Sequence, residues 1–175
     1  METTVKLPEE VDAEYTESVL KLTQNGTEVE KELKHARVMV EVKDGEVVVS
    51  TESGKRDVTS IAKSFRSHVQ NMVEGLENPH RYELKAVYAH FPMTLKKEGN
   101  MVKVENFMGE RKPREADIMD NTEVKIDGDE ITVTSPSKEA ASQTAARIEQ
   151  LSQKGNRDPR TFQDGIYITN AEDGQ

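Results

Sequence analysis

The sequence contains no cysteine and no tryptophan, and only 5% of its 175 residues are aromatic. Without cysteine the chain forms no disulfide and offers no thiolate ligand to a metal ion. No apolar run approaches the roughly 20 residues that a membrane-spanning helix requires, and residues 1–15 lack the basic-then-apolar pattern of a secretory signal. These absences argue against a membrane partner and predict a cytoplasmic location.

Motifs of enzymes and cofactor sites are also missing. The four histidines, His35, His68, His80 and His90, form no HxxxH or HxH pair, and no GxGxxG, GxxxxGK[ST] or GxSxG motif occurs. Ser64 and His68 are one helical turn apart, but no acidic residue is placed to orient the imidazole. We therefore predict no catalytic site, no metal site, no cofactor and no small-molecule substrate. An enzyme whose pocket the sequence does not announce stays an alternative.

The chain is acidic, with 33 Asp or Glu residues against 24 Lys or Arg and a net charge of -9. Such a charge gives no global attraction to nucleic acid and favours solubility instead. High salt changes this expectation, because it reduces the Debye length to about 3 Å at 1 M and leaves local basic patches free to act. The hydrophobic content of 34%, beside 33% charged residues, suits thin layers of sheet and helix better than one large core.

The first half of the chain predicts an antiparallel meander followed by one helix. Short alternating segments are separated by Gln24-Asn25-Gly26 and Asp44-Gly45, which are typical hairpin turns. A helix is then expected from Asp57, as its N-cap, to Asn78-Pro79. Apolar residues recur at helical period along it: Val58, Ile61, Ala62, Phe65, Val69, Met72, Val73 and Leu76. Such a one-sided helix is expected to cover one face of the sheet.

The second half of the chain repeats this plan. Asp127-Gly128 lies 83 residues after Asp44-Gly45, and the apolar residues of a second helix, roughly 138–153, follow those of the first at the same offset. Val124 and Ile126 map one residue away from their counterparts in the first half. A difference in turn length or a bulge would absorb that shift, so the spacing favours a duplicated domain.

We therefore predict an α+β fold of two tandem similar domains, each an antiparallel sheet with one helix packed on one face. The first domain is expected over residues 1–80 and the second over residues 81–175. The last residues, 170–175, are polar and acidic and are expected to form a short disordered tail.

A basic stretch in the second half is the first candidate for a binding site. Residues 96–114 contain six Lys or Arg and three Asp or Glu, in a chain that is acidic as a whole. The turn Glu98-Gly99-Asn100 predicts a hairpin at its start. Three cations and an aromatic residue that we expect to be exposed follow this hairpin: Arg111, Lys112, Arg114 and Phe107.

A second basic segment follows the second predicted helix. Its candidate binding residues are Lys154, Arg157, Arg160 and the aromatic Phe162. Lys and Arg neutralise phosphates, and aromatic rings stack on unpaired bases. Pro113 and Pro159 restrict the two segments, while Gly109 and Gly155 allow close approach of a ligand to the backbone. The sequence thus predicts an RNA-binding site formed by both segments.

The order of HFPM, a hairpin, ENFMGERKPR, a DG turn, QTAARIEQL and RTFQDGIYI is also that of a known family. In these motifs the chain resembles the sixth protein of the large ribosomal subunit, in its archaeal and eukaryotic form. The likeness is most specific over residues 88–114 and 143–168, while FRSHVQNMVEGL in the first half agrees more loosely. The resemblance covers nearly the whole chain.

This resemblance implies a cytoplasmic ribonucleoprotein component that supports translation in an archaeon. The implied partners are large-subunit ribosomal RNA, near the sarcin–ricin region and the stalk base, and neighbouring large-subunit proteins. The family binds RNA mainly through its second domain, where the matching positions are the six cations of the two basic segments. Most members of the family are basic, so the acidity of this chain departs from the family and fits a salt-adapted organism. The alternative is an acidic two-domain protein–protein adaptor that does not bind RNA.

Overall fold

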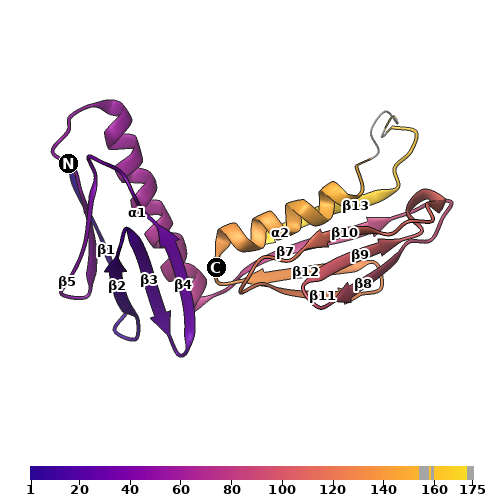
Figure 1. The fold of residues 1–175 in the computed structure, drawn as a ribbon, viewed down its shortest axis with the longest axis horizontal. Helices are drawn as coiled ribbons and strands as arrows, with labels where there is room; N and C mark the ends of the chain where they lie inside the picture. The colour runs from indigo at the N-terminus through magenta and orange to yellow at the C-terminus, as the bar shows by residue number, and fades with distance from the viewer. Residues whose placement is uncertain (154–157, 159, 173–175) are drawn as a thin grey trace. The chain divides into compact units, whose positions relative to one another are not determined.

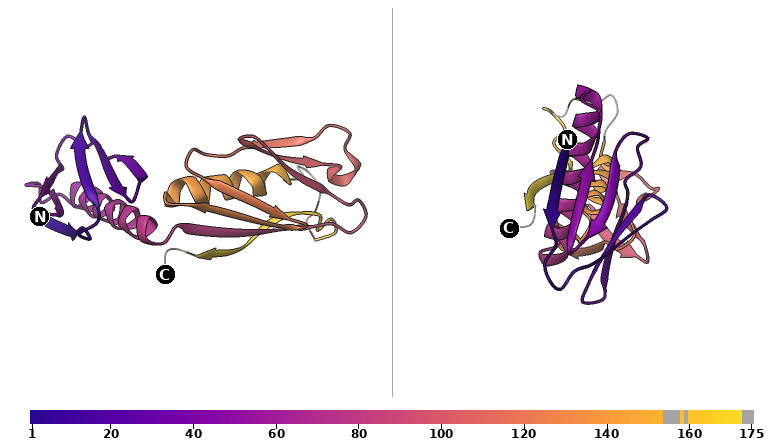
Figure 2. Two further views of the ribbon diagram at one scale, coloured as in Figure 1. Left: turned by 90° about the horizontal axis from the view of Figure 1, so that it is seen from below. Right: turned by 90° about the vertical axis from the view of Figure 1, so that its left-hand side faces the viewer.

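The structure is a computed structural model that describes residues 1–153, 158 and 160–172. Contacts within it divide the chain into two compact units, Met1–Asn78 and Pro79–Gln175. The buried hydrophobic side chains form a separate cluster in each unit. Figures 1 and 2 show that each unit has one long helix beside antiparallel strands.

The first unit consists of two three-stranded antiparallel sheets and one helix, with strand orders β1-β6-β5 and β2-β3-β4. Its elements are β1 (Glu2–Lys6), β2 (Asp12–Thr16), β3 (Val19–Gln24), β4 (Thr27–Glu32), β5 (Met39–Lys43), β6 (Glu46–Ser50) and α1 (Arg56–Glu77). Leu20 and Leu22 in β3 are both buried, because alternate residues of a strand face the same side. Both predicted hairpin turns are confirmed, since Asn25-Gly26 and Asp44-Gly45 have the positive φ angles that such turns require.

Helix α1 faces the core with the apolar stripe that the sequence predicts, and Val58 and Ala62 are among its buried residues. Its start differs from the prediction, because Lys55 and not Asp57 is the N-cap, and the side chain of Lys55 makes no capping hydrogen bond. Asp57 lies in the first turn instead, where a carboxylate interacts favourably with the positive end of the helix dipole.

The second unit has a four-stranded sheet of order β11-β12-β7-β13 and a three-stranded sheet of order β10-β9-β8. Its elements are β7 (His80–Val87), β8 (Thr94–Glu98), β9 (Met101–Glu105), the short 3-10 helix η1 (Phe107–Gly109), β10 (Arg114–Asp117), β11 (Glu123–Asp127), β12 (Glu130–Ser135), α2 (Lys138–Leu151) and β13 (Gly165–Glu172). The hydroxyl of Ser137 caps α2 by accepting a hydrogen bond from the backbone N–H of Ala140, at 3.3 Å.

The end of β13 corrects one prediction. Residues 170–172, expected to belong to a disordered tail, continue the strand and pair with residues 81–83 of β7. A bulge between Ile168 and Asn170 shifts the register by one residue within the strand. The polar composition of the segment reflects an outer strand with exposed residues, not an unfolded end.

The two units repeat one topology, so the predicted fold class of two tandem similar domains is confirmed. In each unit the strand directly before the helix lies between two partners, the first strand of the unit and the strand that precedes it in the sequence. The orders are β1-β6-β5 in the first unit and β7-β12-β11 in the second.

The strand register also explains why the strands of the two halves are offset by one residue from the match of the two DG pairs. The first turn is Asp44-Gly45, whereas the second is Gly128-Asp129 and not Asp127-Gly128. The whole hairpin therefore repeats at an offset of 84 residues, and the sequence match of the two DG pairs is misleading by one.

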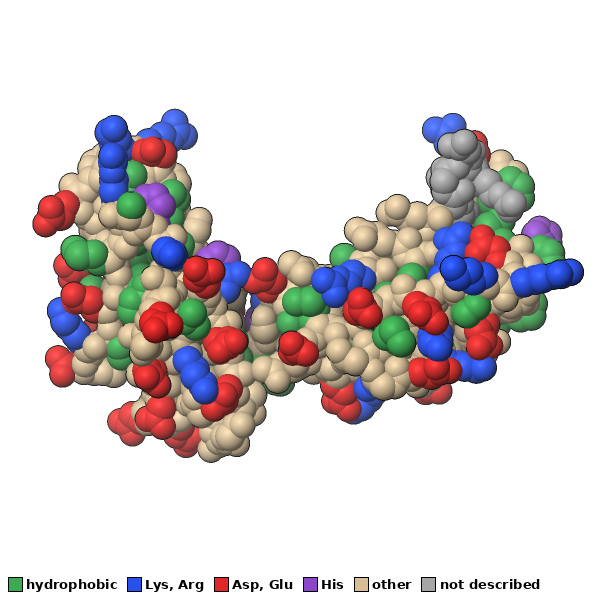
Figure 3. Space-filling view, viewed as in Figure 1, with side chains coloured by type: hydrophobic (Ala, Val, Ile, Leu, Met, Phe, Trp, Pro, Cys, Tyr) green, Lys and Arg blue, Asp and Glu red, His purple; other side chains and the backbone are tan. Residues whose placement is uncertain are grey.

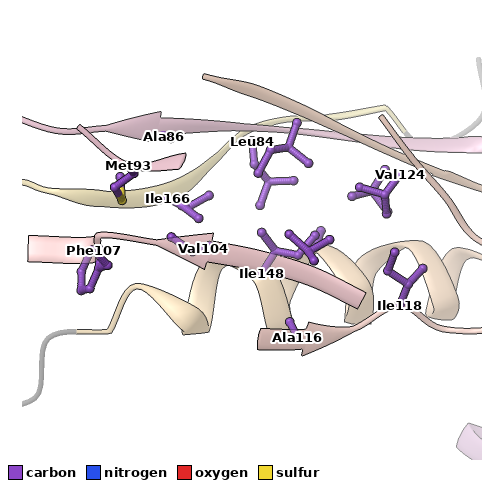
Figure 4. Close-up of a cluster of buried hydrophobic side chains, with 14 residues drawn as sticks. Leu84, Ala86, Met93, Val104, Phe107, Ala116, Ile118, Val124, Ile148 and Ile166 are labelled. Carbon is purple, nitrogen blue, oxygen red and sulfur yellow. The ribbon is translucent and has the colours of Figure 1, made fainter. Parts of the chain in front are cut away.

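The helix positions of Phe65 and Ile148 are equivalent in the repeat, but their burial differs. Ile148 is 0% exposed and lies in the middle of the second core (Figure 4), whereas Phe65 is only partly buried. We expect Ile148→Ala to lower the free energy of unfolding by about 2–5 kcal/mol. Phe65→Ala is expected to cost less than the ~3–5 kcal/mol of a fully buried ring. Denaturant titration of both variants checks this order, and a larger loss at Phe65 would contradict the assigned burial.

Candidate nucleic-acid interface

The first basic segment begins in a tightly curved turn after β9. Asn106, Met108 and Gly109 have φ angles of 60°, 50° and 78°, and the side-chain amide of Asn106 donates to the carbonyl oxygen of Pro92 at 3.0 Å. A Cβ on Gly109 would lie 3.4 Å from the ring of Phe91. The space beside Gly109, where the sequence suggested close approach of a ligand, is therefore filled by a side chain of the protein.

Phe107 is not the exposed aromatic residue that the sequence predicts. Its ring is 1% exposed and belongs to the hydrophobic cluster of the second unit (Figure 4). The guanidinium of Arg114 lies over the ring, 4.4 Å from its centroid, within the range of a cation–π interaction. The ring is thus closed to a nucleic-acid base, and the expectation of an exposed aromatic at this position is wrong.

Arg114 is held by the protein itself. Its Nε and Nη2 donate to the two carboxylate oxygens of Glu110, at 2.9 and 2.7 Å. Its Nη1 donates to the backbone carbonyl oxygens of Leu151, at 2.5 Å, and Gln153, at 3.0 Å. Since a guanidinium has five N–H groups, these bonds occupy most of its donors. Arg114 therefore fastens the first basic segment to the C-terminal end of α2.

Arg111 and Lys112 differ from Arg114 in both exposure and contacts. Both side chains are exposed, in the loop between η1 and β10. Neither has a hydrogen bond or an ion pair with any residue in the described part of the chain. Their charges are therefore available to an outside anion.

Two other cations of the basic stretch, Lys96 and Lys103, are neutralised within the sheet. Lys96 pairs with Glu105 at 2.9 Å, and Lys103 pairs with Glu98 at 2.6 Å and with Glu115 at 3.4 Å. The hydrogen bond to Glu98 and the one to Glu115 raise the pKa of Lys103 above its usual value. The bond from Lys103 lowers the pKa of Glu98. Both shifts favour the charged forms, so these lysines hold the hairpin β8–β9 and contribute little free positive charge.

The second basic segment is described only in part, because Lys154 and Arg157 lie outside the residues that the structure describes. Arg160 is exposed, and its backbone N–H donates to the carboxylate of Asp158 at 2.9 Å. The backbone carbonyl of Asp158 accepts the N–H of Phe162 at 2.9 Å, and the Phe162 side chain is 39% exposed. Arg160 and Phe162 thus belong to one turn that leads into β13.

The first basic segment and the described residues on both sides of the second lie at one end of the second unit. Arg114 binds the carbonyl oxygen of Gln153, the residue directly before the second segment. At the same end, the Asp164 carboxylate accepts the backbone N–H of Ala89 at 3.3 Å, which joins the entrance of β13 to the exit of β7. Figure 3 shows Lys and Arg side chains among hydrophobic ones around this end of the unit.

Two exposed aromatic residues at this end were not selected from the sequence. Tyr88 is 37% exposed and Phe91 is 47% exposed, and both follow β7 directly. The motif His90-Phe91-Pro92 predicts a bend, but the sequence does not show on which side of the bend the ring lies. Together with Phe162, these rings supply the exposed aromatic surface that Phe107 does not.

No group of three or more His, Asp or Glu side chains suited to a metal ion occurs in residues 1–153, 158 and 160–172. The hydroxyl of Ser64, one turn from His68, donates to the carbonyl oxygen of Ser60 at 3.1 Å and is not aligned as a nucleophile. Over the same described residues, no helix has the length and apolar character needed to cross a membrane.

Comparison with known proteins connects this architecture to one family. The family model for ribosomal protein L6 matches residues 91–165. A large ribosomal subunit protein uL6 of Natronomonas pharaonis is 40% identical over 175 residues, covering 99% of this chain and 98% of the relative. The uL6 proteins of Methanosarcina mazei and Haloarcula marismortui are 40% and 39% identical over 165 residues, covering 94% of this chain and 94% and 93% of the relatives. These archaeal relatives are ribosomal proteins and not enzymes, and on this identity the chain belongs to the ribosomal protein L6 family.

Proposed function

We propose that the chain is a structural constituent of the large ribosomal subunit that binds large-subunit ribosomal RNA near the sarcin–ricin region and the stalk base. Membership of the ribosomal protein L6 family supports this proposal, since the relatives are named as large-subunit proteins. The ribosome in the cytoplasm is accordingly its place of action. Neighbouring large-subunit proteins are its further partners.

The observation that carries the RNA-binding part is the convergence of free cations and exposed aromatic rings at one end of the second unit. Arg111 and Lys112 lie in one loop, and Arg160 lies in the turn before β13. Phe91, whose ring lies against Gly109 before that loop, is 47% exposed, and Phe162, in the same turn as Arg160, is 39% exposed. Cations of this kind neutralise phosphates, and exposed rings stack on unpaired bases, so the two features together suit irregular RNA better than a protein partner.

The acidity of the chain is compatible with this proposal, because carboxylates near the proposed cations have partners within the chain. At the proposed interface, Glu110 is engaged by Arg114 and Asp158 accepts the backbone N–H of Arg160. At high salt the remaining carboxylates of the chain are screened beyond a few ångströms. The proposed interface therefore acts locally, and its affinity is expected to depend on a few contacts.

We expect the triple variant Arg111→Gln, Lys112→Gln, Arg160→Gln of the full chain to bind RNA more weakly and with a smaller salt dependence. Each phosphate contact contributes roughly -0.7 to -0.9 to the slope of log K against log salt, so losing three contacts should reduce the slope by about 2–3. The measurement is binding to a transcript containing the sarcin–ricin region and the stalk base, titrated with salt.

The matched control removes three exposed cations elsewhere in the same unit that have no ion pair among the described residues: Lys85→Gln, Lys97→Gln and Arg147→Gln. Both triple variants change the net charge equally, so a general electrostatic effect would weaken both to the same degree. Equal affinities and slopes for the two variants would contradict the proposed interface. If the unmodified chain does not bind the transcript at all, the adaptor function without RNA takes precedence.

A further inference from the structure

The charges of helix α1 are divided unevenly along its length. Lys55, Arg56, Lys63 and Arg66 lie at its start and in its first half, and Asp57 is the only acidic residue from 53 to 73. The next acidic residues, Glu74 and Glu77, lie in the last turns. The unit that contains this positive half has 10 Lys or Arg against 16 Asp or Glu in residues 1–80, so the cations are concentrated where acids are absent.

Arg56 and Lys63 lie on the side of α1 that faces away from the core, Arg66 lies at the edge of that side, and Lys55 is the N-cap residue. Arg56 and Lys63 are seven residues apart, which is two helical turns or about 10.5 Å along the same side. All four cations are exposed, whereas Val58, which lies roughly opposite Arg56 and Lys63, and Ala62 are buried. Figure 3 shows Lys and Arg side chains at the end of the first unit where α1 begins.

This arrangement opposes the helix dipole. Cations are unfavourable near the positive N-terminal end of a helix, and anions are unfavourable near its C-terminal end. Helix α1 has Lys55 and Arg56 at its first residues, and it has no basic residue in its last turn. Lys55 and Arg56 thus oppose the dipole that Asp57 in the first turn favours, and this points to a role of the two cations outside the folding of the unit.

No contact within the described residues explains the four cations. None of them has an ion pair or a side-chain hydrogen bond to another described residue. On the sheets of the same unit, by contrast, Lys21 pairs with Glu28 at 2.8 Å and Lys43 pairs with Glu41. The positive side of α1 is therefore not part of the ion pairing that holds this unit together.

The residues between the cations restrict the kind of ligand. The hydroxyls of Thr59, Ser60, Ser64 and Ser67 donate to backbone carbonyl oxygens four residues earlier, at 2.8–3.1 Å. No aromatic side chain lies on this side of the helix, since Phe65 packs against the core. The long cationic side chains can thus contact phosphates at a distance from the helix, but this side of α1 has no ring that could stack on a base.

We propose that this side of α1, formed by Lys55, Arg56, Lys63 and Arg66, binds the sugar–phosphate backbone of RNA as a second contact, separate from the interface in the second unit. The proposal rests on the proposed function in one respect, that RNA is the partner. An acidic protein is the less suitable partner, because protein interfaces contain apolar and aromatic residues at their centre. The large hydrophobic residues that the first unit exposes among those described are Met1 and Met39, and neither lies on α1.

The test uses the full chain with three substitutions on this side of α1: Arg56→Gln, Lys63→Gln and Arg66→Gln. The control substitutes three exposed cations of the same unit outside α1: Lys6→Gln, Lys34→Gln and Arg37→Gln. Both variants change the net charge by the same amount. Binding to a full-length large-subunit ribosomal RNA transcript is titrated with salt, and thermal melting confirms that both variants fold.

We expect the α1 variant to reduce the salt slope of log K by about 2–3 and the affinity at 0.1 M salt by about 100-fold, as the loss of three phosphate contacts implies. The control should change both quantities much less. Equal changes in the two variants, or no change in the α1 variant, would overturn the proposal. Loss of binding in the α1 variant alone, with the Arg111, Lys112 and Arg160 variant unaffected, would support this contact and reject the interface of the second unit.

Discussion

Replacing Phe107 with Ala is expected to lower the free energy of unfolding by about 3–5 kcal/mol. The ring is 1% exposed and is the largest fully buried side chain among the residues that the structure describes, so its removal leaves a cavity in the second core (Figure 4). It also removes the ring on which the guanidinium of Arg114 lies at 4.4 Å. Denaturant titration of the full chain measures the loss.

The matched control is Phe162→Ala, which removes the same ring from a position that is 39% exposed. We expect this variant to lose less stability than Phe107→Ala, because a partly exposed ring buries less apolar area than a fully buried one. Its RNA affinity should fall, since a stacking ring is worth roughly 1–3 kcal/mol per base. If Phe107→Ala were stable and Phe162→Ala were destabilised, the burial assigned to the two rings would be wrong.

The sequence predicted the regular elements well because local rules determine them. Hairpins at Asn25-Gly26 and Asp44-Gly45 follow from residues that tolerate positive φ angles. The stripe containing Val58 and Ala62 follows from helical period. The repeat of the two units could be predicted for the same reason, because a hairpin turn followed by an apolar helical stripe occurs in each half of the sequence.

Tertiary contacts account for what the sequence did not predict. The sequence around Phe107 is polar and basic, so the ring was expected at the surface, yet three residues with positive φ turn it into the core. The N-cap of α1 was misplaced because Asp57 is a strong capping residue, whereas the helix begins before it without a side-chain cap. The role of Arg114 depends on carbonyl groups 37 and 39 residues away, which no local pattern shows.

The number of cations in the sequence also overestimates the positive charge that the candidate interface offers to RNA. The basic stretch 96–114 has six Lys or Arg, but Lys96, Lys103 and Arg114 are paired within the unit. The free positive charge lies instead on residues such as Arg111 and Lys112. The sequence identifies the basic stretch. The ion pairs in the folded chain then distinguish the cations that stabilise the structure from those that are available to bind RNA.

Arg114→Lys is expected to lower the free energy of unfolding by about 1.5–3 kcal/mol, the range for hydrogen bonds of charged groups. Lysine keeps the charge, but it cannot contact both carboxylate oxygens of Glu110 and the carbonyl oxygens of Leu151 and Gln153 at once. The planar stacking over Phe107 is lost as well. Denaturant titration gives the stability, and the salt-titrated RNA binding of the same variant gives the slope.

The conservative change distinguishes two roles of Arg114. If it binds a phosphate directly, Lys retains the charge and the salt slope, and stability is unchanged. If Arg114 holds the first basic segment to the end of α2, stability falls and RNA affinity falls with it, because the loop of Arg111 and Lys112 loses its fixed position. Arg111→Lys is the control, since that side chain is exposed without a partner among the described residues and its replacement should leave stability unchanged. Equal stability of both Lys variants would show that the contacts of Arg114 do not organise the interface.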